Sequence, residues 1–322
     1  MVKPKDFIKN QIAEIKEEIP EGKAIIAVSG GVDSTTAAFL CSKAIGDRLT
    51  AIHVDTGLMR KNESKKVIEA LKSAGVNATL VEAQDEFFKA MKGVTDPEEK
   101  RKIIGELFID IFEKEAEKIE DAEVLIQGTI APDWIESGTG YSGQTDTIKS
   151  HHNVGGLPEE MNLKLVEPLR ELYKDEVREV ASELSVPKDL YEKQPFPGPG
   201  LAVRILGEVT EEKVKVLQEA DYITRNEIEK SAEKGEIELP WQYFAALLPV
   251  KSVGVQGDLR AYGNTIAVRA VQSADGMTAN FSKFPPELLE RISNKINNKL
   301  KDEINRVVYD ITNKPPGTIE WE

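Results

Sequence analysis

The chain has 322 residues, 42 of them Lys or Arg and 56 Asp or Glu, for a formal net charge of −14. With 40% hydrophobic and 30% charged residues it has the composition of a folded globular protein long enough for about two domains. The acidic balance argues against a nucleic-acid groove, the apolar runs are too short for a membrane span, and the single cysteine excludes an internal disulfide framework, so we expect a cytoplasmic protein without nucleic-acid or membrane partners.

The first half of the chain alternates between helical periodicity and short apolar runs. The expected helices are 4–19, 34–44, 63–74 and 173–184, together with one long helix or two over 97–119. The expected strands are 24–28, 49–54, 77–81 and 124–127. Strands that alternate with helices indicate βαβ units, and therefore an α/β fold with a doubly wound, mostly parallel sheet.

The periodicity stops over 136–162, a glycine-rich stretch of the kind that often forms a functional lid. A second interruption, Gln194–Gly200 (QPFPGPG), predicts a domain boundary because three prolines cannot continue a helix or a central strand. Beyond it, expected helices at 210–234 and 286–300 and strand-like runs at 250–255, 265–271 and 306–311 indicate a smaller α+β module. We therefore assign one domain to 1–195 and a second to 196–322.

A candidate phosphate-binding loop, SGGVDS at residues 29–34, lies between an expected strand and a helix start. Its glycines allow a tight turn, and the N–H groups of a helix N-terminus form a cradle for an anion. Asp33 is unusual there, because a carboxylate repels phosphate unless a cation such as Mg²⁺ lies between them. The alternative is an ordinary glycine turn in which Asp33 caps the helix.

Two further motifs end expected strands. His53-Val54-Asp55-Thr56-Gly57 follows the second strand, and Gln127-Gly128-Thr129 follows the fourth. The carboxyl ends of parallel strands meet at one edge of a sheet, where nucleotides bind at the topological switch point. The three motifs together therefore predict a nucleotide site.

SGGVDS followed by HVDTG resembles the PP-loop ATP pyrophosphatases, and within them the GMP synthetases. The blocks that carry this narrower resemblance run from about residue 5 to residue 322 and include QGTIAPDWIES, IKSHHNVGGLP, PFPGPGLAVRILGEV, KSVGVQGDLRAY and KPPGTIEWE. The resemblance implies an adenine nucleotide alpha hydrolase-like domain followed by a dimerisation domain. It also implies a two-step reaction, in which ATP adenylates xanthosine 5′-monophosphate (XMP) with release of pyrophosphate, and ammonia then displaces AMP to give GMP.

The one-chain members of this family carry a glutaminase before the PP-loop, with a cysteine nucleophile. Here the PP-loop begins about 28 residues into the sequence, and Cys41 lies on an apolar helix where inert packing is the expected role. The chain thus resembles the separate synthetase subunit of a two-chain enzyme. Ammonia would then come free from solution or from a separate glutamine amidotransferase subunit.

For the nucleotide, the resemblance implies that ATP and Mg²⁺ are held by the PP-loop, with Asp33 as metal ligand. The implied ATP-binding residues are Ser29, Gly30, Gly31, Val32, Asp33, Ser34, Thr35, Val54, Gly128 and Thr129. Asp133 is a candidate second Mg²⁺ ligand or an ammonia-side base, or alternatively a helix cap beside Pro132.

Lys149 lies in the expected lid, where a lysine can close over the ATP phosphates. The alternative for Lys149 is a solvated loop charge. His151 and His152 are adjacent and make a poor metal pair, so we expect them to serve the lid or nothing. His53 is expected to be a satisfied core residue.

For XMP, the resemblance implies binding by Arg101, Arg260, Gln272, Lys314, Thr318, Ile319 and Glu320. Arginine and lysine suit its phosphate, and Glu320 would accept hydrogen bonds from the purine or the ribose. The alternative for Arg101 is an exposed helix charge, and Trp321 is expected to pack rather than stack on a base. A homodimer through the second domain is also implied, although the apolar run Tyr243–Val250 suits a core equally well.

Three other functions compete with this one. A tRNA-modifying PP-loop enzyme would need paired cysteines or a basic face, which the net charge of −14 does not favour. NAD synthetase would share the loop but not KPPGTIEWE. A nucleotide-binding regulatory module would have no need of Asp33, Lys149 and the XMP-binding set together.

Overall fold

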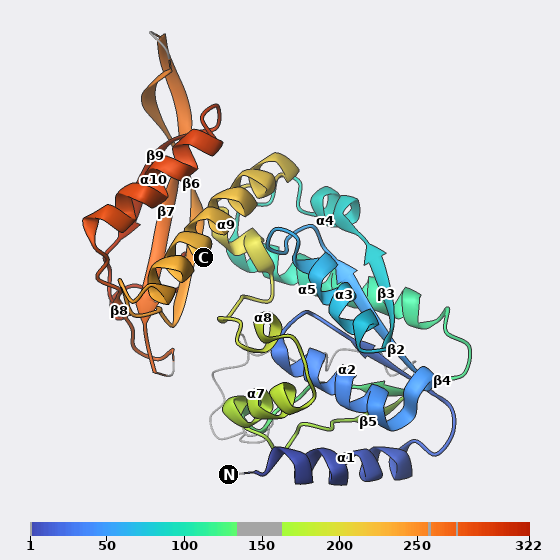
Figure 1. Ribbon diagram of the computed structural model, residues 1–322. Coiled ribbons are helices and arrows are strands. Elements are labelled where there is room, and N and C mark those ends of the chain that lie inside the picture. The colour runs from blue at the N-terminus through green and yellow to red at the C-terminus, as the bar shows by residue number, and fades with distance from the viewer. Residues whose placement is uncertain (1, 134–162, 257–258, 275) are drawn as a thin grey trace. The chain divides into compact units, whose positions relative to one another are not determined.

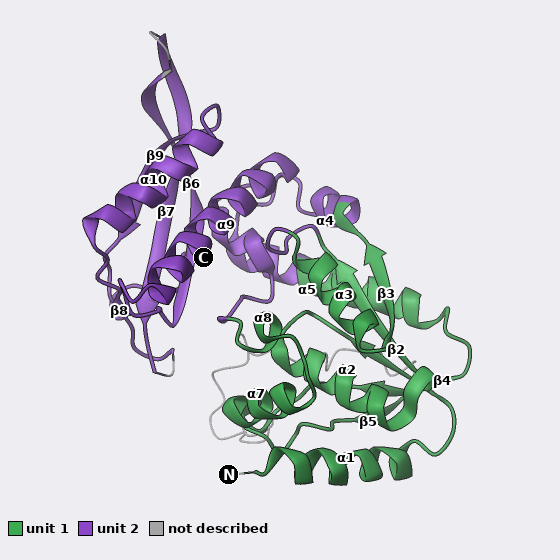
Figure 2. Cartoon of the chain, viewed as in Figure 1, with its two compact units in different colours: residues 1–56, 62–84, 104–193 green, residues 57–61, 85–103, 194–322 purple. Residues whose placement is uncertain are grey.

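The computed structural model describes residues 2–133, 163–256, 259–274 and 276–322 (Figure 1). The expected lid, with Lys149, His151 and His152, lies outside these residues. The chain divides into two compact units, coloured separately in Figure 2: unit 1 comprises 1–56, 62–84 and 104–193, and unit 2 comprises 57–61, 85–103 and 194–322. The chain therefore crosses between the units several times.

Unit 1 contains a parallel sheet of five strands in the order β3-β2-β1-β4-β5. The strands are β1 (Lys23–Ala27), β2 (Leu49–Asp55), β3 (Asn77–Glu82), β4 (Ala122–Ile126) and β5 (Lys164–Val166). Helices connect successive strands from β1 to β4, as parallel strands require. This confirms the predicted doubly wound α/β sheet.

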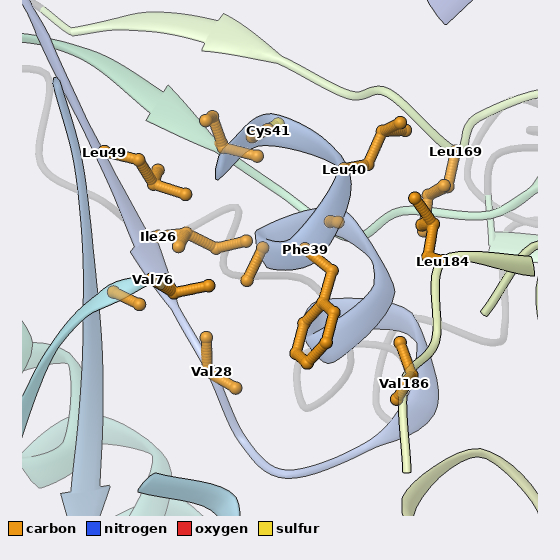
Figure 3. Packing of buried hydrophobic residues seen from close by; sticks show 14 of the residues in the cluster. Ile26, Val28, Phe39, Leu40, Cys41, Leu49, Val76, Leu169, Leu184 and Val186 are labelled. Carbon is orange, nitrogen blue, oxygen red and sulfur yellow. The ribbon is translucent and has the colours of Figure 1, made fainter. Parts of the chain in front are cut away.

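The helices of unit 1 include three that pack on one another, α1 (Pro4–Glu18), α2 (Val32–Ile45) and α7 (Lys174–Glu183). Figure 3 shows side chains of α2 in one cluster with Ile26 and Leu49 of the sheet, and Leu40 on the side toward Leu169 and Leu184. Cys41 is fully buried in this cluster, and burial raises the pKa of its thiol, so packing is its role, as expected. Alternate strand residues such as Ile25 and Ile52 are buried too, so both faces of the sheet are covered.

The other helices flank these elements. They are α3 (Glu63–Ser73), α4 (Gln84–Ala90), α5 (Pro97–Ala116) and the short α8 (Lys188–Tyr191), with a 3₁₀ turn η1 (Gly46–Arg48). The predicted helices and strands of the first half are confirmed to within a few residues at each end. The elements α4, α8 and β5 were not predicted, because they are too short to show a clear period.

Unit 2 contains a mixed sheet in which β7 (Leu259–Gln272) is central. It pairs antiparallel with β6 (Gln242–Gln256) and β8 (Asn280–Phe281), and parallel with β9 (Ile304–Asp310). Helices α9 (Glu211–Glu233) and α10 (Pro286–Lys299) pack together against the sheet, and a 3₁₀ turn η2 (Gly200–Arg204) precedes them (Figure 1).

The apolar run 243–250 forms most of the first half of β6, where Tyr243–Leu247 are buried. Its apolar character is therefore explained by the core of unit 2. The predicted strand at 250–255 is the outer half of the same 15-residue strand. Among the described residues, no helix is both long enough and apolar enough to span a bilayer.

Candidate functional site

Two loops of unit 1 meet at the point where the chain leaves the sheet in opposite directions. From β1 the chain continues toward β2, on one side, and from β4 toward β5, on the other. Since β1 and β4 are neighbours, the loops at their carboxyl ends flank the topological switch point, where open α/β sheets bind ligands. These loops are the predicted PP-loop and Gln127-Gly128-Thr129.

The PP-loop is built from backbone and two hydroxyl groups. Helix α2 begins at Val32, with Gly31 as its N-cap, and Gly30 has φ 80°, a left-handed conformation that favours glycine. The hydroxyl groups of Ser29 and Ser34 lie 3.2 Å apart, and the Ser29 amide donates to Ser34 Oγ at 3.3 Å. The N-cap residue Gly31 has no side chain to bond the first N–H groups of α2, which suits them to form an anion cradle.

Asp33 lies in the first turn of α2 and does not cap it. Its Oδ2 accepts a hydrogen bond from Lys174 Nζ at 2.5 Å, whereas Oδ1 is buried and has no hydrogen-bond partner within the described part of the chain. Burial raises the pKa of this carboxyl; Lys174 opposes the rise and Asp133 adds to it. An orphaned carboxylate oxygen near a second carboxylate is an arrangement that suits a divalent cation.

Gly128 and Thr129, after β4, lie directly against this loop. A Cβ atom on Gly128 would come within 2.9 Å of Ser34 N and 3.0 Å of the Asp33 carbonyl carbon, so only glycine fits. Thr129 is buried, and its hydroxyl has no partner among the described residues. Asp133 accepts a hydrogen bond from Ile130 N at 3.2 Å, the return half of a capping box. Asp133 lies within the helical turn 131–133 and is not the residue before it, and its charge also acts on Asp33.

Three residues that sequence reasoning did not assign to the site hold the PP-loop in place. His53 Nδ1–H donates to the Val28 carbonyl at 2.6 Å, and burial lowers the pKa of the imidazole; its Nε2 is buried without a partner among the described residues, so His53 is only half satisfied. Lys193 donates to the Gly30 carbonyl at 3.3 Å and pairs with the buried Glu63. The third is Lys174, on α7. In the sequence, His53 is distinguished only by its position in an apolar strand, and the two lysines only by their charge. These signals are too weak to assign the three residues to the site.

The predicted XMP-binding residues all lie in unit 2, and several meet along residues 312–322. Lys314 Nζ donates to the Gly276 carbonyl at 2.8 Å, and Thr318 Oγ1 donates to the Glu320 carbonyl at 2.5 Å. Ile319 is buried in the cluster around Phe244, which fixes the segment against the sheet. Glu320 is held by Arg204 through two hydrogen bonds of 2.9 and 2.7 Å.

The remaining predicted XMP-binding residues lie elsewhere in unit 2. The Gln272 side chain is bonded to the backbone of Leu239 and Trp241, and Arg101 pairs with Glu98 one turn earlier. Arg260 is exposed near the opposite end of β7 from Gln272, twelve residues away, or about 40 Å at roughly 3.3 Å per strand residue. One chain therefore does not bring Arg260 and Gln272 to a common site.

Comparisons with known proteins find relatives that match almost the whole chain. The family described as "GMP synthase C terminal domain" matches residues 226–321, and the family "NAD synthase" matches residues 1–107. The chain is 58% identical to a protein of Thermococcus kodakarensis that is named as one of the subunits of a glutamine-hydrolyzing GMP synthase, over 98% of this chain and 99% of that protein. It is 57% identical to the protein of the same name from Methanopyrus kandleri, over 100% of both. With the glutamine-hydrolyzing GMP synthase of Lactobacillus acidophilus the identity is 55%, over 98% of this chain but 60% of that protein.

Proposed function

Since the chain belongs to the GMP synthase family, we propose that it is a synthetase subunit that aminates XMP to GMP with the consumption of ATP. It is a ligase-type enzyme of purine nucleotide biosynthesis. The observation that carries this proposal is the match, over almost the whole chain, to relatives named as separate subunits of GMP synthase, with the PP-loop at the switch point of the sheet. The two steps below are those that the resemblance to the GMP synthetases implies, and the residues at the loop are assigned to them as proposals.

In the first step, the C2 oxygen of XMP attacks the α-phosphorus of ATP, and the bond to the pyrophosphate oxygen breaks. The protein needs to align the reactants and to stabilise the charge on the leaving pyrophosphate. The N–H groups at the start of α2 and the hydroxyl groups of Ser29, Ser34 and Thr129 are the donors for it. Lys174 Nζ, beside Asp33, supplies positive charge at the same loop.

In the second step, ammonia attacks C2 of the adenylylated XMP, AMP leaves, and the amine loses a proton. Asp133 is the first carboxylate after Gln127-Gly128-Thr129, and its Oδ2 also accepts a hydrogen bond from Ile130 N. We retain it as a candidate base or metal ligand. Lys149, in the stretch 136–162, is proposed to close over the phosphates.

We propose Mg²⁺ as the metal cofactor. The Asp33 Oδ1 oxygen, buried without a partner among the described residues and influenced by the charge of Asp133, is the atom that would hold it. Bound there, Mg²⁺ would neutralise the charge of the ATP phosphates. No group of three or more metal-ligating side chains is found among the described residues, so phosphate and water oxygens would complete its shell.

We further propose two protein partners and a cytoplasmic location. The names of the relatives, which denote one subunit of a glutamine-hydrolyzing enzyme, support a separate glutamine amidotransferase as the source of ammonia. A homodimer is supported by exposed apolar side chains on the β6–β7 hairpin, where Val255 is 77% and Tyr262 69% exposed. A second copy would also bring another Arg260, which one chain keeps apart from Gln272. The domain of residues 1–195 would then be the ATP pyrophosphatase, and that of 196–322 the XMP-binding and dimerisation domain.

A turnover assay on the purified chain tests the proposal. With ATP, Mg²⁺, XMP and an ammonium salt we expect GMP, AMP and pyrophosphate in equal amounts, and with glutamine in place of ammonium we expect none. Omission of XMP should abolish pyrophosphate release. ATP binding without GMP in any mixture would contradict the catalytic proposal and favour a nucleotide-binding regulatory module.

A further inference from the structure

Three fully buried cationic side chains of unit 2 share one feature: each is bonded to the stretch 310–322. Lys100 pairs with Glu322 and donates to the Ala202 and Ile205 carbonyls at 3.2 and 2.8 Å. Arg269 pairs with Asp310 and donates to the carbonyls of the same stretch at Thr312 and Thr318. Arg204 is bonded to Glu320.

The Arg204–Glu320 pair combines a buried cation with a partly exposed carboxylate. Arg204 is completely buried, whereas the Glu320 side chain is 22% exposed. The carboxylate therefore forms the outer side of the pair and the guanidinium the inner side. Burying an arginine is costly unless its charge and its donors are satisfied, and such a pair seldom adds more stability than apolar residues would. The pair is therefore better explained by the orientation that it gives to the Glu320 carboxylate.

The geometry fixes that orientation. Arg204 Nε donates to Glu320 Oε2 at 2.9 Å, and Nη2 donates to Oε1 at 2.7 Å, a two-pronged contact that restricts the carboxylate to one orientation. Gln242 Nε2 donates to Oε1 at 2.9 Å. A carboxylate accepts about four hydrogen bonds, so these three donors leave one acceptor position, on Oε2.

The guanidinium itself is held in place by its surroundings. It lies 3.9 Å from the ring centroid of Phe244 and 5.2 Å from that of Phe196, contacts that restrict its position. Asp221 Oδ1 lies 4.0 Å from Nη1, and Arg225 and Arg60 share the same carboxylate. Arg204 thus stands in a fixed frame of aromatic and charged groups.

We propose that Arg204 is a positioning residue, which holds the Glu320 carboxylate so that its one remaining acceptor on Oε2 receives a hydrogen-bond donor of the purine nucleotide substrate. This inference rests on the proposed function and deepens it. It assigns a role to the PFPGPGLAVRILGEV block, which contains both Phe196 and Arg204.

Arg204→Lys tests the proposal, because lysine keeps the positive charge beside Asp221 and Glu320 but loses the planar fork. We expect the KM for XMP to rise by about tenfold or more, with the KM for ATP and the kcat at saturating XMP changed by less than about threefold. Arg225→Lys is the matched control. Arg225 is also largely buried and bonds the same Asp221 at 2.7 Å, but it makes no described contact with Glu320, so the KM for XMP should rise much less than in Arg204→Lys.

If Arg204→Lys fails to fold, Phe196→Leu replaces it, because this change loosens the position of Arg204 and removes no charge or donor. A smaller rise in the KM for XMP alone is then expected. A native chain that forms no GMP would overturn the proposed function itself. A native chain that forms GMP, with variants that change the KM for both substrates equally or for neither, would overturn only the positioning role.

Discussion

The PP-loop of unit 1 and the stretch 310–322 of unit 2 solve opposite problems in binding a charged ligand. At the PP-loop, polar groups are left incomplete within the described part of the chain: Asp33 Oδ1 and the Thr129 hydroxyl are buried without partners, and α2 begins without a side-chain cap. Along 310–322 the carboxylates are paired with cations of the protein itself, Arg204, Arg269 and Lys100, although Arg204 Nη1 and Arg269 Nε have no hydrogen-bond partner among the described residues.

The difference follows from what each region is proposed to bind. A triphosphate with a cation brings enough charge to complete a site. Donors and acceptors can therefore stay unpaired in the free chain, although this lowers its stability. A purine base brings far less charge than a triphosphate and is recognised through single hydrogen bonds. Discrimination then depends on acceptors held in one orientation, and this requires a rigid surrounding network.

The largest effect is expected from Asp221→Asn, which removes the carboxylate beside Arg204 in the paired network of unit 2. Asp221 is buried, and burial alone would raise its pKa, but Arg225, Arg60 and Arg204 together bring the pKa of the carboxyl below its usual range. The neutral side chain leaves three buried cations without their shared counter-charge, so we expect a loss of about 3–5 kcal/mol in the free energy of unfolding. Urea denaturation measures it.

A control for Asp221→Asn lies on the same helix. Glu211 forms an exposed pair with Lys215, and Glu211→Gln should cost less than about 0.5 kcal/mol. Because the pKa of Asp221 is lowered on folding, its contribution is present above the unfolded-state pKa and is lost as pH falls through the folded-state value. Equal losses in the two variants would contradict the central role of Asp221.

Asp33→Asn changes the PP-loop, and it should lower the activity. The amide keeps the shape but cannot neutralise a divalent cation, so we expect pyrophosphate release to fall by about 10²–10³-fold. XMP-dependent pyrophosphate release at saturating Mg²⁺ is the measurement, with Asp47→Asn, an exposed carboxylate of the same unit, as control. Unchanged activity would refute the metal-binding role.

Gly128→Ala tests the close approach of the two switch-point loops. The added methyl group meets backbone atoms of Asp33 and Ser34, which cannot move aside as a flexible side chain can. Over-packing of this kind costs about 1–3 kcal/mol, so we expect the Kd for ATP to rise by about tenfold or more. Calorimetric titration with ATP measures the Kd, and an unaltered value would mean that the loops separate easily.

The smallest effect concerns the pH dependence of stability in the absence of ATP and metal. Burial raises the pKa of Asp33 on folding, even beside Lys174. Between the unfolded-state and folded-state pKa values the folded chain holds more protons, so the free energy of unfolding falls as pH rises through that window.

Asp33→Asn removes this penalty. At neutral pH the variant should be more stable than the native chain, and the advantage should disappear as the pH falls below the unfolded-state pKa. Thermal unfolding over a pH series measures the difference. A variant that is less stable at neutral pH would show that the Lys174–Asp33 pair outweighs burial.

Sequence reasoning performed well where one face or both faces of an element are buried. Most strands of unit 1 are short apolar runs, and the longer helices carry a clear period, so both were found. The order of the strands then placed the PP-loop and Gly128 at one edge, as predicted. The site assignments themselves stay predictions.

The unpredicted features depend on contacts between residues far apart in the chain. Lys174 is 141 residues from Asp33, and Arg204 is 116 from Glu320. No local period records such pairings. The separation of Arg260 from Gln272 was equally hidden, because the sequence did not reveal that one strand continues through 259–272.

The repeated crossing of the chain between its units limits how such an enzyme can be recombined. Unit 2 takes in 57–61 and 85–103, and with them Arg60 and Lys100, which contribute charge to its interior. A single crossover near residue 195 between two relatives would exchange the sheet of unit 2 but leave those cations with the other parent. A recombined chain should therefore keep the interior of unit 2 from one parent only when residues 57–61, 85–103 and 194–322 are exchanged together.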